Sequence, residues 1–147
     1  MIKGMNHVGI SVASLDRSIR FYRDVLGMEM ISQRTFEGGQ YEAILALGGA
    51  SGRVALLKAQ NMQLELFEFS RPAPAPGVPN RPVCDHGITH FCVEVSDVEG
   101  EYERMKSAGV VFHCPPVEFF CAAKAAYARD PDGNAFELLE LLPNGRL

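Results

Sequence analysis

The sequence predicts an α+β fold in which one pattern of strands and a helix occurs twice. Residues 6–10 (NHVGI) are similar to residues 89–93 (THFCV), and residues 64–68 (LELFE) are similar to residues 136–140 (FELLE). Further apolar positions recur at the same separation of 83 residues as His7 and His90, namely Leu15 with Val98, Ile19 with Tyr102, and Tyr22 with Met105. This duplication predicts two similar modules, each with one His and one Glu at matching positions.

In the first module, over residues 4–70, apolar and polar residues alternate through 4–12, which indicates a strand. Ser14 is a suitable N-cap for the helix that follows, and Gly27 can end it in a left-handed conformation. The apolar stripe of that helix is Leu15, Ile19, Tyr22 and Leu26. The remaining expected elements are a strand at 28–36, a short helix at 41–47, a glycine-rich loop at 48–52, and strands at 53–58 and 62–69.

The connector at 71–84 contains five prolines, which favour a stiff extended segment. In the second module, over 85–143, Asp97 can cap a helix at 97–108 and Gly109 can end it. Strands are expected at 87–95, 110–114, 124–129 and 134–142, and residues 130–134 (DPDGN) predict a tight turn. We expect the two modules to form one domain over residues 1–147.

The first module has about ten more residues than the second between the end of its helix and its last strand, by comparison of the repeated motifs. The surplus falls within the glycine-rich segment 37–52. Such an insertion is either a lid or wall of a substrate cavity or a tolerated surface loop. The residues favour neither interpretation.

Composition narrows the class of protein. A hydrophobic fraction of 47%, a charged fraction of 22% and a net charge of −4 are ordinary for a soluble globular chain. No Lys/Arg cluster provides a phosphate-binding footprint, so we expect no nucleic-acid or membrane partner. No run approaches the roughly 20 apolar residues of a membrane span. The four cysteines lack CxxC spacing, which is consistent with reduced thiols in a cytoplasmic protein.

The repeated residues His7, Glu65, His90 and Glu137 are candidate ligands of a divalent metal ion. Strand alternation places each Glu on the face opposite its large aliphatic or aromatic neighbours, where a lone carboxylate loses hydration unless a cation compensates it. A single strand His is more often a hydrogen-bonded structural residue, and a single strand Glu usually faces solvent. The occurrence of both in both modules favours metal binding.

Two imidazoles and two carboxylates suit Zn²⁺, Ni²⁺, Co²⁺, Mn²⁺ or Fe²⁺. An octahedral ion with four protein ligands has two positions left for substrate oxygens, and a carboxylate that dissociates can act as a base. His86 and His113 have no such counterparts and are expected to be non-ligands. Glu68 and Glu140 also recur, but on the helix-facing side, so we expect them at strand ends in contact with solvent.

Several motifs together resemble the vicinal oxygen chelate superfamily, which includes glyoxalase I, methylmalonyl-CoA epimerase, extradiol dioxygenases and fosfomycin- and bleomycin-resistance proteins. The motifs are NHVGISV at 6–12, LDRSIRFY at 15–22 with VLG at 25–27, GITHF at 87–91, and RDPDGN at 129–134 with FEL at 136–138. The resemblance implies two βαβββ modules that form an open, curled, eight-stranded mixed sheet around a metal cavity.

Within that superfamily the order His7, Glu65, His90 and Glu137 is similar to the ligand set of bacterial glyoxalase I. Epimerases usually have Gln in place of Glu65, and bleomycin-binding members generally lack the metal ligands. Ser11 stands near the position where such glyoxalases tend to have an Arg for the glutathione carboxylate. Whether the substrate carries glutathione or a CoA thioester is therefore open.

The leading hypothesis is a metal-dependent isomerase or lyase that stabilises an enediolate next to a carbonyl, with Glu137 or Glu65 as the proton shuttle. One alternative is an Fe²⁺ extradiol-type dioxygenase. The other is a non-catalytic protein that binds a small molecule among Phe67, Phe69, Phe119, Phe120 and Tyr127. The expected substrate contacts are Ser11, Phe67, Phe69, Cys92 and Tyr127. Open sheet edges and the resemblance favour a homodimer, and the metal site is either within one chain or shared by two.

Overall fold

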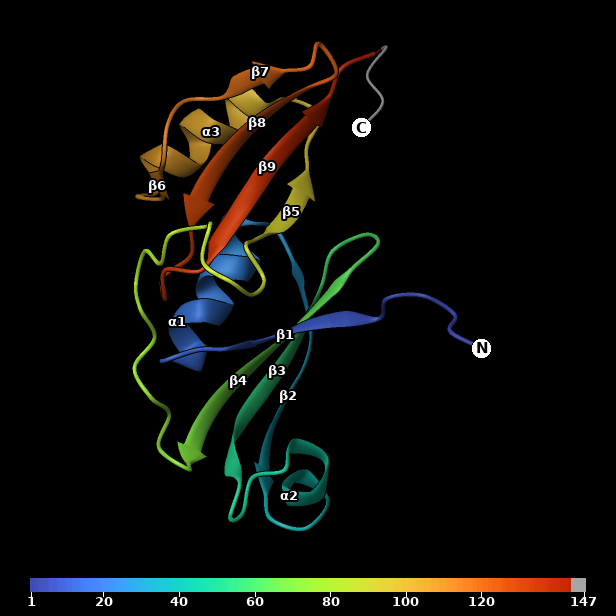
Figure 1. Ribbon diagram of the computed structural model, residues 1–147, viewed down its shortest axis with the longest axis vertical. Coiled ribbons are helices and arrows are strands. Elements are labelled where there is room, and N and C mark those ends of the chain that lie inside the picture. Colours follow the sequence, from blue (N-terminus) through green and yellow to red (C-terminus); the bar gives the residue numbers. More distant parts are fainter. Residues whose placement is uncertain (144–147) are drawn as a thin grey trace. The chain divides into compact units, whose positions relative to one another are not determined.

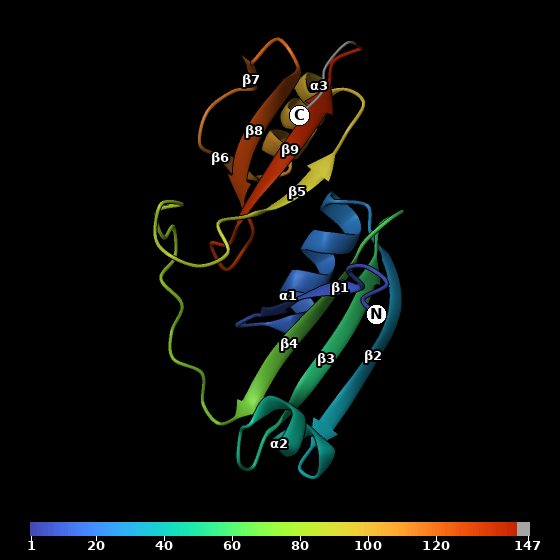
Figure 2. The ribbon, with the colours of Figure 1, turned by 45° about the vertical axis from the view of Figure 1, so that its right-hand side comes forward.

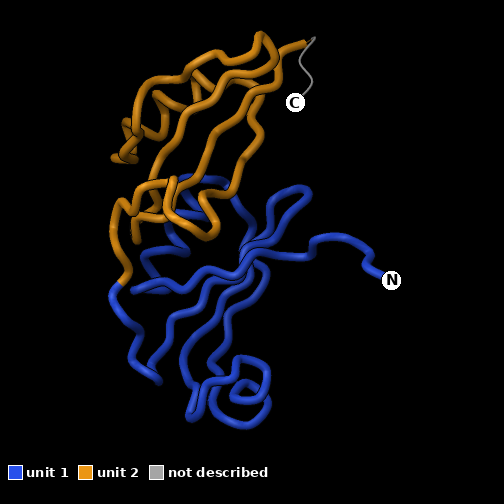
Figure 3. Tube along the Cα trace, viewed as in Figure 1, with its two compact units in different colours: residues 1–76 blue, residues 77–147 orange. Residues whose placement is uncertain are grey.

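The computed structural model describes residues 1–143, which form two compact units (Figure 3). Unit 1 comprises residues 1–76 and unit 2 begins at residue 77. The boundary lies within the proline-rich segment, where no helix or strand occurs between residues 72 and 90. Each unit contains one mixed sheet and at least one helix. None of the helices within residues 1–143 is long and apolar enough to cross a membrane.

Unit 1 contains β1 (His7–Ser11), α1 (Leu15–Arg20), a π-helical turn (Phe21–Val25), β2 (Glu29–Glu37), α2 (Gln40–Leu45), β3 (Ser51–Lys58) and β4 (Gln63–Arg71). Its four strands are ordered β1-β4-β3-β2 (Figure 1). β1 pairs with β4 in parallel, whereas β4 with β3 and β3 with β2 are antiparallel. The first strand and the last strand of the unit are therefore neighbours.

Unit 2 contains β5 (Phe91–Glu94), α3 (Val98–Ser107), β6 (Val111–Phe112), β7 (Val117–Phe119), β8 (Ala123–Arg129) and β9 (Ala135–Leu141). The strand order is β5-β9-β8-β6, and β7 also pairs with β8. As in unit 1, the first and last strands of the unit pair in parallel. α3 packs on one face of β8 and β9 (Figure 2).

The core of each unit lies between its long helix and one face of its sheet. In unit 1 the apolar stripe of α1 and the turn after it is buried with alternate residues of β3 and β4: Leu15, Ile19 and Tyr22 with Ala55, Leu57, Leu64 and Leu66. In unit 2 the corresponding set is Val98, Tyr102 and Met105 with Ala126, Phe136 and Leu138. Alternation then places Glu65 and Glu137 on the faces of their sheets opposite α1 and α3.

The predicted α+β class is confirmed, and the helices and most strands lie close to where the sequence places them. Gly27 and Gly109 have φ values of 71° and 88°, as expected at the ends of the two helices. Three details differ. The expected strand at 87–95 is short, the helix from Leu15 becomes a π-helical turn at Phe21, and β7 is additional to the eight predicted strands in the described chain. β7 has the sequence VEF, too short for periodicity to reveal.

Candidate functional site

The first His–Glu pair lies on the face of the unit 1 sheet opposite α1. His7 begins β1, and Glu65 lies in β4 opposite Gly9, two residues further along. His7 Nε2 is 3.5 Å from Glu65 Oε2. The other ring nitrogen, Nδ1, is 2.9 Å from the side-chain oxygen of Asn6, to which it donates. With Nδ1 bound to the amide oxygen, Nε2 is the ring nitrogen left near the carboxylate.

The second pair has the same register in unit 2. His90 directly precedes β5, and Glu137 lies in β9 opposite Cys92, again two residues further along. His90 Nε2 is 3.1 Å from Glu137 Oε2, and its Nδ1 is 2.8 Å from the hydroxyl of Thr89. Asn6 and Thr89 occupy the same position in the repeat. Both units therefore build the pair with an imidazole, a carboxylate and a polar side chain that orients the ring.

Each pair has the spacing of two adjacent ligands on one ion. Zn–N and Zn–O bonds are about 2.1 Å long, so two cis ligands lie about 3.0–3.5 Å apart for angles between 90° and the tetrahedral value. The His–Glu distances of 3.5 Å and 3.1 Å fall in that range. Ligand histidines usually donate their second N–H to a fixed acceptor, as His7 does to Asn6. The donors and their orientation therefore fit a divalent metal ion.

The neighbours of the two carboxylates differ between the units. Glu65 lies between Gly9 on β1 and Leu56 on β3, neither of which has a polar side chain. Glu137 lies between Cys92 on β5 and Tyr127 on β8, both of which carry a protic group. Partial desolvation, the charge of Glu137 and a hydrogen bond to its carboxylate raise the pKa of the Cys92 thiol to about 12. Cys92 is therefore a neutral hydrogen-bond donor beside Glu137 at neutral pH.

In unit 1, aromatic rings continue the face that carries Glu65. Phe67 and Phe69 follow Glu65 at alternate positions of β4, and their rings stack with centroids 5.5 Å apart. Phe36 packs edge-on against both rings, and Tyr41 of α2 packs on Phe36 at 4.8 Å. The insertion predicted at 37–52 thus contributes Tyr41 to an aromatic wall. Ser11 lies at the end of β1 opposite Phe67, exposed on the same face as His7.

His113 is a further neighbour of Tyr127 in unit 2, whereas Phe119 and Phe120 contact each other near the start of β8. His113, which sequence reasoning left without a partner, accepts a hydrogen bond from Nε of Arg129 at 2.9 Å, and its ring stacks on Tyr127 at 6.1 Å. Desolvation and the positive charge of Arg129 lower the pKa of His113. Phe119 pairs with Ala123, four residues before Tyr127 on β8, and its ring contacts that of Phe120 at 5.6 Å.

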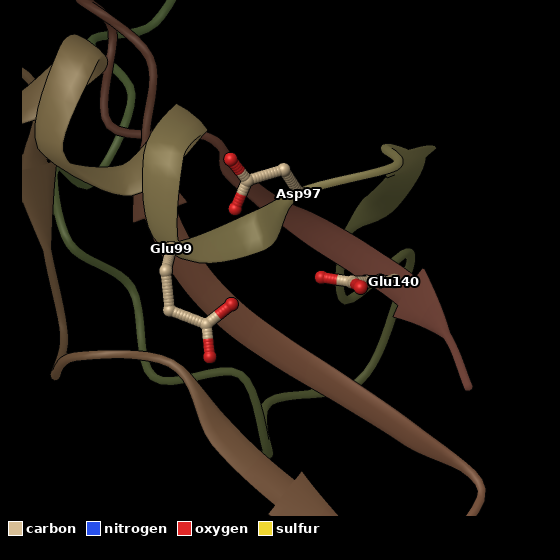
Figure 4. A group of neighbouring side chains, drawn as sticks. All are labelled: Asp97, Glu99 and Glu140. Carbon is tan, nitrogen blue, oxygen red and sulfur yellow. The ribbon is translucent and has the colours of Figure 1, made fainter.

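A second group of acidic side chains in unit 2 is explained by its hydrogen bonds. Asp97, Glu99 and Glu140 gather at the start of α3 (Figure 4). Asp97 accepts from the backbone N–H of Gly100, and Glu140 accepts from that of Val98. Lys124 donates to Glu99 at 2.7 Å. These carboxylates anchor the helix to the sheet.

Glu140 and Glu68 were expected at strand ends in contact with solvent; they are half-buried, and both also have partners within the protein. Glu140 caps α3. Glu68 forms an ion pair with Arg53, which also binds Asp16 of α1. Strand parity correctly placed both residues on the helix-facing side, but it could not show that Arg53 would pair with Glu68 or that Glu140 would accept from the backbone of Val98.

Fold and paired residues together define a duplicated βαβββ protein with the elements of a chelating site. A family model described as the Glyoxalase/Bleomycin resistance protein/Dioxygenase superfamily matches residues 4–138, and the chain belongs to this superfamily. It is 30% identical over 141 residues to lactoylglutathione lyase of Haemophilus influenzae, an alignment that covers 91% of this chain and 90% of that protein.

Plant relatives and solved structures extend the comparison. The chain is 28% identical to a probable chloroplastic lactoylglutathione lyase of Arabidopsis thaliana, with 95% of this chain aligned but only 36% of that longer protein. A glyoxalase family protein from Bacillus cereus superposes with a TM-score of 0.89 at 23% identity over 97% of this chain and 96% of that one. A fosfomycin resistance protein from Listeria monocytogenes gives 0.69 at 19% identity over the full length of both chains. These two structures show the shared fold.

Proposed function

We propose that the protein is a divalent-metal-dependent lyase or isomerase of the glyoxalase type. The observation that carries the proposal is the matched pair of half-sites, in which an oriented imidazole nitrogen lies 3.5 Å or 3.1 Å from a strand carboxylate. The likeness to a bacterial lactoylglutathione lyase across most of both chains supports the same reaction class.

In this proposal His7, Glu65, His90 and Glu137 hold one ion, contributed either by one chain or by two chains of a homodimer. When bound, such an ion (Ni²⁺, Zn²⁺, Co²⁺, Mn²⁺ or Fe²⁺) would supply Lewis-acid polarisation of the carbonyl and adjacent oxygen of the substrate. Glu137 or Glu65 removes the proton from the carbon next to the carbonyl and returns it to the neighbouring carbon. The Cys92 thiol supports Glu137 by donating to its carboxylate.

The substrate is a small molecule with an α-hydroxycarbonyl or equivalent group. Ser11, Phe67 and Phe69 would contact it from unit 1, and Cys92 and Tyr127 from unit 2. Phe67 and Phe69 are only half-buried, so they offer ring surface to an apolar substituent. Ser11 stands near the position where related glyoxalases tend to have an Arg for the glutathione carboxylate. The proposal therefore does not specify whether the substrate carries glutathione or CoA. We expect a cytoplasmic homodimer.

The first test is metal loading followed by activity measurement. The purified chain, stripped with chelator and reloaded with each of the five ions, is assayed with the hemithioacetal of methylglyoxal and glutathione and with the corresponding CoA adduct. Formation of the thioester product is followed by absorbance. Activity that requires an ion and disappears with chelator supports the proposal. Ion-independent binding without turnover would favour a sequestration protein, and oxygen consumption with catechols would favour the dioxygenase alternative.

Glu137→Gln then tests the role of the carboxylate. Without a base or an anionic ligand, turnover should fall by at least about 100-fold, the lower end for loss of general base catalysis. Glu118→Gln is the matched control, because Glu118 is an exposed residue of β7 in the same unit. Both variants should retain the wild-type circular dichroism spectrum. Wild-type turnover by Glu137→Gln would contradict the proposal.

A further inference from the structure

The two units differ in how they hold the backbone of the histidine in their His–Glu pair. His7 is the first residue of β1 and pairs with Gln63 of β4, so the sheet itself fixes its position. In unit 2 the paired strand begins one residue later, with Phe91 opposite Phe136. His90 therefore lies just outside β5, at the end of a segment without helix or strand. Its position depends on that segment.

The side chain of Arg81 closes the segment that leads to His90. Residues 82–89 are all exposed, so burial does not hold them in place. The guanidinium of Arg81 donates from Nη1 to the carbonyl oxygen of His86 at 3.0 Å and from Nη2 to that of Ile88 at 2.8 Å. Ile88 is only two residues before His90. One rigid, planar side chain thus binds the backbone at two points immediately ahead of the imidazole.

Gly87, between the two carbonyl groups, has a backbone conformation that suits this contact. Its φ is 130°, in the region that favours glycine. A Cβ at this position would lie 3.3 Å from Nη1 of Arg81, which is tighter than ordinary van der Waals contact. The guanidinium therefore lies directly against the backbone of Gly87, and a side chain on this residue would disturb it.

Arg129 connects Arg81 to the sheet of unit 2. Its Nη2 donates to the carbonyl oxygen of Arg81 at 3.0 Å, and its Nη1 donates to that of Gly133 at 3.0 Å. Arg129 ends β8, and Gly133 lies in the turn that leads to β9, the strand of Glu137. The two arginines thus link the segment before His90 to the strands that hold the carboxylate of the pair.

We propose that Arg81 is a positioning residue for His90, which it keeps beside Glu137 by fixing the segment before β5. The inference deepens the proposed function, and its consequence for metal binding rests on that function. With His90 Nε2 held 3.1 Å from Glu137 Oε2, both ligands are in place before an ion binds. Groups that are ordered beforehand lose less conformational freedom on binding, so they bind more tightly. In unit 1 the pairing of β1 with β4 has the same effect.

A purely structural role for Arg81 predicts a different result. If the guanidinium only stabilises the connector, its loss lowers the melting temperature and leaves the His90 ring in place in the folded chain. If Arg81 positions His90, its loss changes the surroundings of the imidazole at temperatures where the chain is fully folded. The ring of Tyr127, whose centroid is 4.8 Å from that of His90, allows this change to be measured.

Three variants test the inference against one matched control. Arg81→Met removes the donors and keeps an unbranched side chain, whereas Arg81→Lys keeps the charge and loses the planar group. Gly87→Ala keeps the guanidinium and places a methyl group against it. Arg104→Met is the control, because Arg104 lies in the same unit and its guanidinium binds Glu101 of α3.

The measurements separate the position of the ring from binding of the ion. In the stripped protein, nuclear Overhauser effects between the rings of His90 and Tyr127 are recorded, with the ring signals of His7 as an internal reference. Zn²⁺ affinity is measured by calorimetry well below the melting temperature of each variant. The visible spectrum of the Co²⁺-loaded protein then shows whether the arrangement of ligands has changed.

For Arg81→Met we expect the His90–Tyr127 effects to be lost, the Co²⁺ spectrum to change, and Zn²⁺ affinity to fall by about 10-fold to 100-fold, as for an outer-shell partner of a ligand. Gly87→Ala should show the same changes. Arg81→Lys should show smaller ones, because an ammonium group can bind one carbonyl but lacks the fork that binds two. Arg104→Met, and the His7 signals of every variant, should match wild type.

Wild-type ring contacts and Zn²⁺ affinity in Arg81→Met would overturn the inference, even if the melting temperature fell, and the proposed function would stand. Failure of the wild-type chain to bind any divalent ion would overturn the proposed function. In that case, loss of the His90–Tyr127 contacts in stripped Arg81→Met would still support Arg81 as the residue that positions His90.

Discussion

At the scale of single residues, Asp130 shows how one side chain fixes a turn next to the site. Its carboxylate, 5% exposed, accepts from the backbone N–H groups of Asp132 and Asn134 and from the side-chain amide of Asn134, at 2.8–2.9 Å. The turn joins β8, which carries Tyr127, to β9, which carries Glu137. The register that places these two residues opposite each other therefore depends in part on this carboxylate.

Asp130→Ala should lower the free energy of unfolding by about 2 kcal/mol, because three donors lose a charged acceptor at a buried position. Urea denaturation followed by circular dichroism measures the change. Asp132→Ala is the control, since Asp132 donates to the Asp130 carboxylate from its backbone N–H, which the substitution keeps. Equal stabilities of Asp130→Ala and wild type would show that the turn forms without its carboxylate.

His113 makes the stability of the fold depend on pH, and the direction of its pKa shift gives the sign of that dependence. Its pKa is below the ordinary value of 6.5, because desolvation and the adjacent Arg129 disfavour the imidazolium. The unfolded chain therefore binds the proton more readily than the folded chain, and folding loses stability as pH falls from about 6.5 through the lower folded pKa. The imidazolium also cannot accept the hydrogen bond that Arg129 donates.

Replacement of His113 by Gln keeps a hydrogen-bond acceptor for Arg129 but removes the group that takes up a proton. The melting temperature of His113→Gln should therefore decline less than that of wild type between pH 7.5 and pH 5, and the two should agree most closely at the upper end. Thermal melts at a series of pH values measure the difference. A steeper decline in the variant would reverse the sign and contradict the assignment.

At the scale of elements, a basic residue ties the long helix to the sheet in both units. In unit 1, Arg53 of β3 binds Glu68 of β4 and two oxygens of Asp16 in α1. In unit 2, Lys124 of β8 lies opposite Glu140 of β9 and binds Glu99 of α3. The cations occupy corresponding register positions, so the contact is part of the duplicated pattern.

A double-mutant cycle tests this anchor in unit 1. Arg53→Met and Glu68→Gln should each destabilise the chain, and the combined variant should lose less than the sum, with a coupling of about 1 kcal/mol as for partly exposed ion pairs. Arg23→Met with Asp24→Gln, an exposed pair of adjacent residues, is the control and should show weaker coupling. Strict additivity in the Arg53–Glu68 cycle would show that the anchor does not contribute to stability.

The sequence could predict the elements whose signals are local. Periodicity and caps placed α1 and α3, and the repeated motifs identified His7, Glu65, His90 and Glu137 as two pairs with matching geometry. Relations that depend on strand register were not predictable. Nothing in residues 53–56 or 123–127 shows that Arg53 faces Glu68 or that Tyr127 faces Glu137, because the strand partner is set by the whole sheet.

Gly133 is required for one local reason, which the sequence shows, and for one long-range reason, which it does not. The motif DPDGN predicted the positive φ, which is 86°. The second requirement for glycine is long-range: a Cβ there would lie 2.9 Å from the backbone of Pro79 and Asn80 in the connector. That contact joins a turn and a proline-rich segment that are more than 50 residues apart, and turn chemistry alone carries no signal for it.

At the scale of the whole molecule, the two units contain matching His–Glu pairs whose surroundings differ. Unit 1 combines His7 and Glu65 with stacked aromatic rings, and unit 2 combines His90 and Glu137 with a thiol and a phenol. An ancestral repeat would have had equal halves. Under the proposed function, divergence of the residues beside each carboxylate would let one half bind the apolar part of a substrate and the other handle its charge.

Each half-site alone supplies one imidazole and one carboxylate, fewer than the three protein ligands that a catalytic zinc site usually has. We therefore expect His7→Ala and His90→Ala each to reduce Zn²⁺ affinity by at least about 100-fold, more than the loss of an outer-shell partner would. The wild-type chain should bind one ion per chain. His86→Ala is the control, because His86 is exposed and lies outside both pairs. Calorimetry and elemental analysis on the stripped and reloaded proteins measure affinity and stoichiometry. If one of the two variants bound Zn²⁺ with wild-type affinity, the ion would belong to the other unit alone, and the joint site would have to be abandoned.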